Sequence, residues 1–197
     1  MMNHPGDGDK RQQILVAAVK VFSQKGFHEA KVDEIAQLAD VGKGTVYEYF
    51  SSKTELFQEM FKSGMQFYMS NLKNELKPGL SCREKLTRIA KLHLRFIAKY
   101  KDLARITMTE HTYFNEEFRK WIWENRTKKI ELVEQIIKEG VKSGEFREVD
   151  SRVAALAFNG ILGAMFSPII FSKGKQNTKE LIEPFSDILF NGLLSSK

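Results

Sequence analysis

Residues 32–53, with the sequence VDEIAQLADVGKGTVYEYFSSK, constrain the fold of this chain more than any other segment. Apolar residues recur at helical spacing on both sides of a short turn, namely Ile35, Ala36, Ala39, Val46 and Phe50. Each group forms one apolar face of a short helix. The small Ala36 lets the two helices approach closely, and Val41 is the lone hydrophobe of the turn. The pattern therefore predicts a helix-turn-helix.

The solvent-facing positions of the second predicted helix carry hydrogen-bond donors and aromatic hydroxyls. These positions are Lys43, Gly44, Thr45, Tyr47, Glu48 and Tyr49. A merely solvated helix rarely collects this mixture, whereas the groove of DNA and its flanking phosphates suit it. We therefore expect this helix to contact DNA.

Charge supports this expectation by its placement and not by its amount. The formal net charge is +6, yet residues 1–53 contain seven Lys or Arg and seven Asp or Glu, so the predicted DNA-binding part is neutral. Several cations lie near predicted helix starts, where the helix dipole prefers an anion: Lys10, Arg11, Lys31, Lys43 and Lys53. A DNA phosphate would compensate each of them. The alternative is that they are exposed residues, tolerated at about a few tenths of a kcal/mol each.

The composition of the whole chain predicts a globular all-α protein. Of its 197 residues, 42% are hydrophobic and 28% are charged. Four prolines, no β-alternation and long runs of period 3.6 predict helices throughout. The single Cys82 excludes an intrachain disulfide and fits a reducing cytosol. The first ten residues lack the apolar core of a secretory signal, so we expect a cytoplasmic location.

Helix start and stop signals divide the chain into about nine helices. We expect them at residues 10–25, 32–39, 43–50, 53–76, 82–100, 102–111, 115–141, 151–171 and 177–194. The first ends at Gly26, a C-cap glycine followed by the hydrophobe Phe27. The fourth begins with a Ser-x-x-Glu capping box at Ser52 and Glu55. We expect residues 1–53 to form a three-helix DNA-binding domain and residues 54–197 to form a helical ligand-binding and dimerisation domain, with the fourth helix shared as a rigid element.

Residues 153–171 contain no charge and are long enough in principle to span a bilayer. We reject a membrane span because Asn159, Ser167 and Pro168 interrupt the run and no second span exists. A helix that is apolar all round is otherwise buried against neighbours and a partner. Small residues at Ala155, Gly160, Gly163 and Ala164 would allow a close approach. We therefore expect a homodimer through the last two helices, about residues 150–195, with burial inside one chain as the alternative.

Residues 11–57 resemble the N-terminal motif of TetR/AcrR-type transcriptional regulators. The resemblance rests on ILVAAVKVFSQKGF followed by VDEIAQLADVGKGTVYEYFSSKTELF, a highly specific motif that covers about a quarter of the chain. It implies a homodimer that binds a palindromic operator, usually represses transcription, and is released when a small molecule occupies the C-terminal domain.

The resemblance also implies roles for individual residues. Lys43, Gly44 and Thr45 match positions that approach base edges, whereas Tyr47, Tyr49 and Lys53 match phosphate contacts. Three positions depart from the family pattern: Lys31 stands where a hydroxyl usually caps the second helix, Asp40 where glycine usually makes the turn, and Gly42 where serine usually caps the third helix. Asp tolerates the left-handed conformation and Gly is an acceptable N-cap, so we expect the fold to survive. Lys31 could replace the missing hydroxyl as a phosphate contact.

The family reading predicts a lipophilic cavity in the C-terminal domain. Its helices are rich in aromatic residues and methionine, which suit packing around a flexible ligand. The candidate lining residues are Phe96, Tyr100 and Trp121 with three polar residues on apolar faces, His93, Asn125 and Asn159. For each polar residue the alternative is a hydrogen-bonded core position.

A basic stripe recurs at helical spacing on the helix that starts near Cys82, through Arg88, Lys91, Arg95 and Lys99. A solvated face is one reading, and contact with an anionic head group is the other. With an aromatic cavity, the second reading predicts a long-chain acyl-CoA as the ligand. Residues 143–146, Ser-Gly-Glu-Phe, likewise resemble the fatty-acid-responsive branch of the family. The runner-up is a repressor of a multidrug efflux pump that responds to hydrophobic drugs.

The sequence offers little for an enzyme. The four histidines, His4, His28, His93 and His111, lack metal-ligand spacing, Cys82 has no nearby histidine, and no glycine-rich phosphate loop follows a strand. We therefore expect no catalytic residue, no metal and no cofactor.

Overall fold

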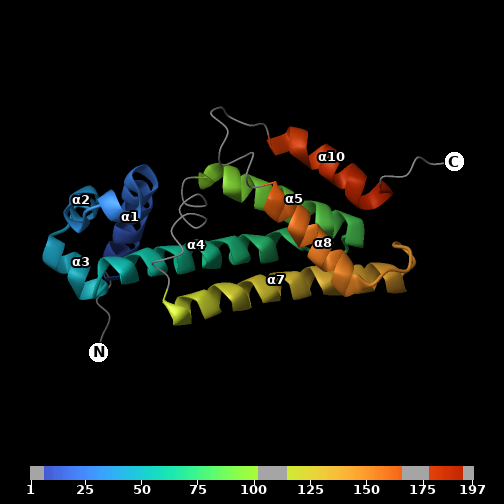
Figure 1. Cartoon of the computed structure of the whole chain (residues 1–197), viewed down its shortest axis with the longest axis horizontal. Coiled ribbons are helices and arrows are strands. Elements are labelled where there is room, and N and C mark those ends of the chain that lie inside the picture. Colours follow the sequence, from blue (N-terminus) through green and yellow to red (C-terminus); the bar gives the residue numbers. More distant parts are fainter. Residues whose placement is uncertain (1–6, 102–114, 166–177, 193–197) are drawn as a thin grey trace. The chain divides into compact units, whose positions relative to one another are not determined.

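A computed structural model describes residues 7–101, 115–165 and 178–192, and every regular element within them is an α-helix (Figure 1). The eight described helices are α1 Asp7–Glu29, α2 Val32–Leu38, α3 Lys43–Tyr49, α4 Lys53–Glu75, α5 Cys82–Lys99, α7 Glu116–Lys142, α8 Ser151–Ala164 and α10 Thr178–Asn191. The all-α prediction is confirmed. The helix expected at residues 102–111, residues 166–171 of the run at 153–171, and His4 and His111 lie outside the described residues.

Contacts divide the chain into two compact units, and the division falls inside α4 between Phe67 and Tyr68. The first unit holds α1 to α3, the first part of α4 and the start of α7 up to Arg119; the second holds the rest. The functional boundary expected after residue 53 stays a prediction, because a division by contacts does not measure which residues bind DNA or ligand.

An aromatic cluster forms the core of the first unit, where α1, α2 and α3 lie together (Figure 1). The ring of Phe57 lies 5.0 Å from the rings of Phe22, Phe27 and Phe61. The chain of α1 breaks helical geometry at Gly26, which has a φ of 73°. This left-handed turn directs Phe27 back into the core, as the glycine followed by a hydrophobe predicted. The helix itself starts at Asp7, three residues before the expected start.

The first helix of the second unit, α5, is capped from two sides. The Ser81 hydroxyl accepts a hydrogen bond of 3.2 Å from the Glu84 amide, and the Glu84 carboxylate accepts one of 2.8 Å from the Ser81 amide. The Glu145 carboxylate accepts the amides of Cys82 and Arg83, each at 2.8 Å. The unpaired amides of the first turn thus find partners, which explains why α5 begins at Cys82 as predicted.

The loop that carries Glu145 depends on two glycines. Gly144 has a φ of 76°, a conformation that favours glycine. A Cβ atom on Gly140 would lie 2.3 Å from the ring of Phe146, so only glycine lets that ring pack onto the end of α7. Residues 143–146 therefore turn the chain after α7 and place a carboxylate at the start of α5.

Candidate DNA-binding surface and ligand-binding region

The helix-turn-helix of the first unit consists of α2, the turn at residues 39–42, and α3. Its packing residues are buried as predicted: Ile35, Ala36, Ala39, Val46 and Phe50. Asp40 adopts a φ of 52°, so an aspartate takes the left-handed position of the turn. The Val41 amide then donates a hydrogen bond of 3.0 Å to the carbonyl of Ala36, which closes the turn.

Two of the three departures from the family pattern concern helix caps. Lys31 precedes α2 with extended backbone, and its side chain makes no capping hydrogen bond, because an ammonium group cannot accept one. The Glu34 carboxylate instead accepts the Lys31 amide at 3.5 Å. Gly42 precedes α3 with a φ of −69° and a ψ of 150°, which is N-cap geometry without a capping side chain. Both helices therefore start where predicted but with weaker caps.

The outer face of α3 is open to solvent. Lys43, Gly44 and Tyr47 are exposed, whereas Thr45 and Tyr49 are half-buried. A Cβ atom on Gly44 would meet nothing within 4 Å, so the packing of this chain does not require glycine there. The absence of a side chain leaves room for a close approach by another molecule. Sequence reasoning named these five residues together with Glu48, which is also exposed.

The ammonium of Lys43 is paired within the helix-turn-helix. Its Nζ lies 3.0 Å from Oδ2 of Asp33 on α2, and both side chains are exposed. The hydrogen bond that Lys43 donates to Asp33 raises the pKa of Lys43 above its usual value. The sequence analysis missed this pair, which joins residues ten positions apart.

Intramolecular partners also hold other cations that were expected to need a phosphate. Lys53 donates a hydrogen bond of 3.0 Å to the carbonyl of His28, and its burial lowers its pKa. Arg11 pairs with Glu59 at 2.7 Å. Arg11, Lys43 and Lys53 thus already have partners within the chain, and their expected phosphate contacts stay predictions. Lys31 is exposed and makes no ion pair within the described ranges.

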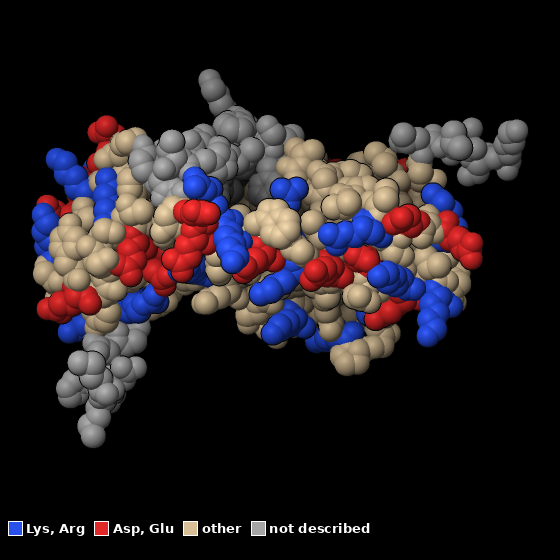
Figure 2. All heavy atoms as spheres, turned by 60° about the horizontal axis from the view of Figure 1, so that its bottom comes forward, with Lys and Arg blue, Asp and Glu red and all other residues tan. Residues whose placement is uncertain are grey.

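Charges of both signs are interspersed over the molecular face shown in Figure 2. Lys and Arg side chains alternate with Asp and Glu side chains there and form no broad basic patch on that face. This mixture agrees with the neutral count for residues 1–53. A DNA contact by residues 1–53 would therefore depend on individual side chains more than on bulk charge.

In the second unit, the predicted polar residue His93 on α5 is buried. Burial and the nearby Lys129 lower its pKa to about 3, so the imidazole is neutral at physiological pH. Its ring packs edge to face against Tyr68 of α4, with 5.8 Å between ring centroids. Tyr68 also contacts Phe96 at 5.2 Å, and Phe96 contacts Tyr100 at 4.7 Å. The structure thus brings His93, Phe96 and Tyr100 together.

Two buried polar atoms of this unit lack a hydrogen-bond partner among the described residues: the Tyr68 hydroxyl oxygen and Oδ1 of Asn159. Burial raises the pKa of Tyr68, so the hydroxyl keeps its proton. The Asn159 amide nitrogen donates to the carbonyl of Ala155 at 2.9 Å. Buried polar atoms are nearly always satisfied, so each of these two oxygens is a candidate partner for a ligand atom or a water molecule. Tyr68 was not among the candidate lining residues, because its position in the sequence gives no sign of an unmatched hydroxyl.

The two candidate lining residues on α7, Trp121 and Asn125, give weaker support for a ligand site. Asn125 on α7 is half-buried and donates to the carbonyl of Trp121 at 2.8 Å, a bond within its own helix. Trp121 is also half-buried. The amide nitrogen of Asn125 is therefore hydrogen-bonded within the chain, as the alternative to a ligand contact predicts.

The four cations of the basic stripe on α5 differ in whether a carboxylate lies nearby. Arg88 and Arg95 approach the Glu75 carboxylate at 3.7 and 3.0 Å, so part of their charge is balanced within the chain. Lys91 is exposed and makes no ion pair in the part of the chain that the structure describes. Lys99 is exposed, with its ammonium 5.3 Å from the ring of Tyr100. Of the stripe, Lys91 and Lys99 thus lack a carboxylate partner among the described residues.

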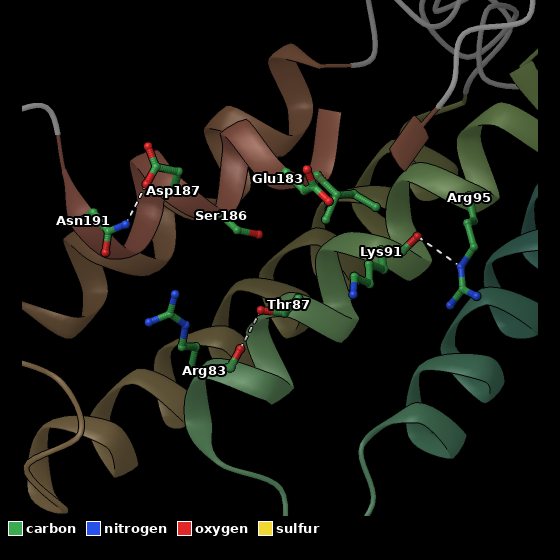
Figure 3. A pocket seen from close by; sticks show the side chains of 9 residues that line it. Arg83, Thr87, Lys91, Arg95, Glu183, Ser186, Asp187 and Asn191 are labelled. Carbon is green, nitrogen blue, oxygen red and sulfur yellow. Dashed lines mark hydrogen bonds between the residues drawn. The ribbon is translucent and has the colours of Figure 1, made fainter. Parts of the chain in front are cut away.

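Lys91 lines a groove of about 580 Å³ between α5 and α10, shown in Figure 3. Arg83 and Lys91 point into it from α5, while Arg95 is turned towards the carbonyl of Lys91 (Figure 3). The guanidinium of Arg83 lies 4.6 Å from the ring of Phe190, which holds it in place. The opposite wall carries Glu183, Ser186, Asp187 and Asn191. The sequence analysis missed Arg83, although its spacing of four from Thr87 and eight from Lys91 continues the same helix face.

One side of α8 is buried and the other is an exposed apolar face. Ala155, Phe158 and Leu162 face the core of the unit. The exposed face comprises Val153, Leu156, Ala157, Gly160, Ile161, Gly163 and Ala164. The burial of Ala155 within the chain removes it from the small residues expected at an interface.

Membrane-spanning helices and metal-ligand clusters are both absent from the described residues. No described helix is both long and apolar enough to cross a bilayer. Within the same ranges, His, Cys, Asp and Glu side chains form no group of three or more that could hold a metal ion.

Comparison with known proteins covers nearly the whole chain. A family model of bacterial regulatory proteins, tetR family, matches residues 14–60, and a model of the tetracyclin repressor-like C-terminal domain matches residues 79–193. The fatty acid metabolism regulator protein of Bacillus subtilis (strain 168) is 29% identical over 185 residues, which cover 93% of this chain and 95% of that protein.

Two solved structures are similar over their whole lengths. The fatty acid degradation regulator FadR of Bacillus halodurans has a TM-score of 0.81 at 27% identity and covers 98% of both chains. FadR of Bacillus subtilis in complex with stearoyl-CoA also has a TM-score of 0.81, at 28% identity over 93% of this chain and 99% of that chain.

Proposed function

The chain belongs to the TetR family of DNA-binding transcriptional regulators, and from this premise we propose that it is a cytoplasmic repressor of a palindromic operator, released by a lipophilic ligand. The observation that carries the DNA-binding part is the open face of α3. We propose that Lys43, Gly44 and Thr45 approach base edges in the major groove. Lys31, Tyr47, Tyr49 and Lys53 contact phosphates. We assign the chain no catalytic residue and no cofactor.

A selection from random duplex DNA tests this function. The purified full-length chain is mixed with the library, and bound DNA is recovered, amplified and sequenced over several rounds. We expect a palindromic sequence whose half-sites lie about one or more helical turns apart, because a two-fold symmetric dimer places its recognition helices in successive major grooves. Recovery of no enriched sequence would contradict the proposal.

We propose that two copies pair through α8 and α10. The support is the exposed apolar face of α8, where Val153 and Leu156 are 61% and 46% exposed. Gly160 and Gly163 on this face would allow two helices to approach closely, because a Cβ atom at either would meet nothing within 4 Å. An apolar helix face of this kind is expected to be covered in solution.

Light scattering after size-exclusion chromatography tests this interface. We expect Leu156→Asp to yield a monomer that binds operator weakly. Trp123→Asp is the matched control, because Trp123 is an exposed hydrophobe on α7, away from the proposed interface. A dimer that survives Leu156→Asp but not Trp123→Asp would place the interface elsewhere.

We propose a long-chain acyl-CoA as the ligand. The similarity to a regulator solved with stearoyl-CoA supports this class. The ring contacts of Tyr68 with His93 and Phe96, and of Phe96 with Tyr100, also support it. So do the buried oxygens of Tyr68 and Asn159 that lack a hydrogen-bond partner among the described residues. Trp121 and Asn125 of α7 are proposed as further lining residues. The acyl chain would lie among apolar side chains, and a polar group of the ligand would pair with the buried oxygens.

Three probes separate the parts of such a ligand: stearoyl-CoA, stearate and CoA. The readouts are the melting temperature of the chain and its affinity for the selected operator. We expect only stearoyl-CoA to raise the melting temperature and release the operator. No change in either readout would refute the acyl-CoA proposal, and release by hydrophobic drugs alone would favour the efflux-pump repressor.

We propose that the groove between α5 and α10 holds the anionic head of this ligand. Arg83 and Lys91 would pair with phosphates, with Arg88 and Arg95 nearby on the same helix. Carboxylates and amides on α10 would accept the amide and amine donors that CoA also carries. We expect Lys91→Gln to weaken stearoyl-CoA binding about tenfold, since a hydrogen bond to a charged group is lost. Lys99→Gln removes the same charge outside the groove, and an equal effect of this control would contradict the assignment.

The route from ligand to DNA is proposed to run through α4. This helix is continuous from Lys53 to Glu75 and includes Tyr68. Its first residue, Lys53, is hydrogen-bonded to the carbonyl of His28 in α1. Ligand binding would shift the segment 54–76 and change the separation of the two recognition helices of a dimer. A coupling free energy of about 1–3 kcal/mol is sufficient for regulation of this kind.

A further inference from the structure

The pair of Lys43 and Asp33 occupies the surface that the proposed function assigns to DNA. Lys43 is the first residue of α3, and Asp33 lies in the first turn of α2. Their side chains are 53% and 61% exposed, so the salt bridge between them is open to solvent and to an approaching duplex. No helix-packing role requires it, because the apolar faces of α2 and α3 already hold the two helices together.

The helix dipole favours the charge of Asp33 and disfavours the charge of Lys43. A carboxylate near the start of α2 is favourable, because the helix dipole presents positive charge there. An ammonium at the start of α3 is unfavourable for the same reason. Asp33 compensates Lys43 in the DNA-free chain and holds the ammonium towards α2. An ammonium has three N–H donors, so this bond leaves two of them for DNA atoms within reach of the held ammonium.

Contacts that keep the bond to Asp33 and contacts that break it differ in free energy. A phosphate that draws the ammonium away from Asp33 replaces one anionic partner by another, so this contact gains little. Guanine offers two acceptors, N7 and O6, to the donors that remain free. The internal carboxylate thus penalises a phosphate contact that breaks the ion pair more than a base contact that leaves it intact.

We propose that Asp33 is a specificity-determining residue that suppresses non-specific phosphate contacts by Lys43. This inference rests on the proposed role of Lys43 in base recognition. It assigns Asp33 a positioning role, since its carboxylate acts through Lys43 and need not touch DNA. Loss of the carboxylate releases the ammonium to any phosphate within reach.

The test compares operator DNA with a scrambled duplex of equal length, over a range of salt concentrations. We expect Asp33→Asn to bind the scrambled duplex about threefold more tightly, in the range typical of an exposed ion pair. The slope of log affinity against log salt for scrambled DNA should steepen by about one, because one more phosphate is neutralised. Operator affinity should rise less, so the ratio of specific to non-specific affinity falls.

Two controls separate this mechanism from a simple change of charge. Asp40→Asn removes the same charge from the same module, and asparagine tolerates the φ of 52° at this position. A second comparison places Asp33→Asn in a Lys43→Met background. We expect the effect of Asp33→Asn to disappear there. An undiminished effect in that background, or an equal effect of Asp40→Asn, would overturn the inference.

The outcome also distinguishes the inference from the function on which it rests. A wild-type chain that selects no DNA sequence contradicts the proposed function itself. A wild-type chain that selects an operator, with an unchanged specificity ratio in Asp33→Asn, contradicts the inference alone. Melting temperatures of all variants verify that each is folded.

Discussion

The ammonium of Lys53, at the first residue of α4, donates a hydrogen bond of 3.0 Å to the backbone carbonyl of His28 near the end of α1. It also lies 4.7 Å from the centre of the Phe27 ring. A cation is favourable at a helix C-terminus, where carbonyl groups lack partners. Lys53 therefore stabilises the first unit in addition to its proposed phosphate contact.

This double role predicts that Lys53→Ala and Lys31→Ala differ in stability but not in their effect on DNA binding. Both should weaken binding to all sequences and reduce the salt slope by about one. Only Lys53→Ala should also lower the melting temperature, because Lys31 makes no ion pair among the described residues. Filter binding at several salt concentrations and thermal denaturation measure the two effects. An unchanged salt slope for Lys53→Ala would restrict Lys53 to its structural role.

We predict that Gly42→Ser stabilises α3. The backbone at residue 42 already has N-cap geometry, and an added Cβ would meet only the Thr45 hydroxyl at 3.9 Å. A serine hydroxyl could accept an unpaired amide of the first turn, with a gain of about a few tenths of a kcal/mol over glycine. Gly42→Ala adds the same Cβ without the acceptor and should destabilise. Denaturant titration of both variants checks the prediction, which fails if alanine stabilises as much as serine.

Tyr68→Phe should affect stability and ligand binding in opposite directions. The buried hydroxyl lacks a partner among the described residues, so its removal should raise the stability of the ligand-free chain by about 1 kcal/mol. The same change removes a proposed partner of the ligand and should weaken stearoyl-CoA binding. Chemical denaturation and ligand titration give the two values. A clear loss of ligand-free stability would mean that the hydroxyl is hydrogen-bonded in solution, for example to water.

His93 should make the second unit sensitive to acid. Burial and Lys129 lower its pKa to about 3 in the folded chain, whereas the unfolded chain keeps a value near 6.5. Between these values the unfolded state binds the additional proton, so stability is fully present above about pH 6.5 and falls towards pH 3. The loss is at most roughly 1.4 kcal/mol per pH unit. His93→Gln should flatten the dependence of the unfolding free energy on pH over this window, and an unchanged slope would refute the assignment.

Much of the first unit was predictable because its signals are local. The apolar residues of α2 and α3, the glycine break at Gly26 and the Ser52 cap of α4 each act over a few residues. All appear in the structure as expected: the Ser52 hydroxyl accepts the Glu55 amide at 3.1 Å. The reciprocal half of that capping box differs, since the Glu55 carboxylate accepts the Ser51 amide at 2.7 Å. Even here the deviation is one residue.

The partners of charged and polar side chains were less predictable. The stripe on α5 was read as four equivalent cations, yet Glu75 of α4 takes up Arg88 and Arg95 and leaves Lys91 to the groove with Arg83. Likewise, neither the spacing nor the composition distinguishes Tyr68, with its unmatched hydroxyl, from the other aromatic core residues. These distinctions depend on which helices are neighbours.

The sequence by itself determined the all-α fold, the helix-turn-helix and the residues on the outer face of α3, because helical periodicity and turn chemistry depend on residues close together in the chain. Only the tertiary structure decided which cations are already paired. Asp33 and Lys43 are ten positions apart, and Lys53 and His28 are twenty-five apart, so they meet through the packing of separate helices. An ion pair needs its two charges within a few ångströms, and no local pattern specifies that distance.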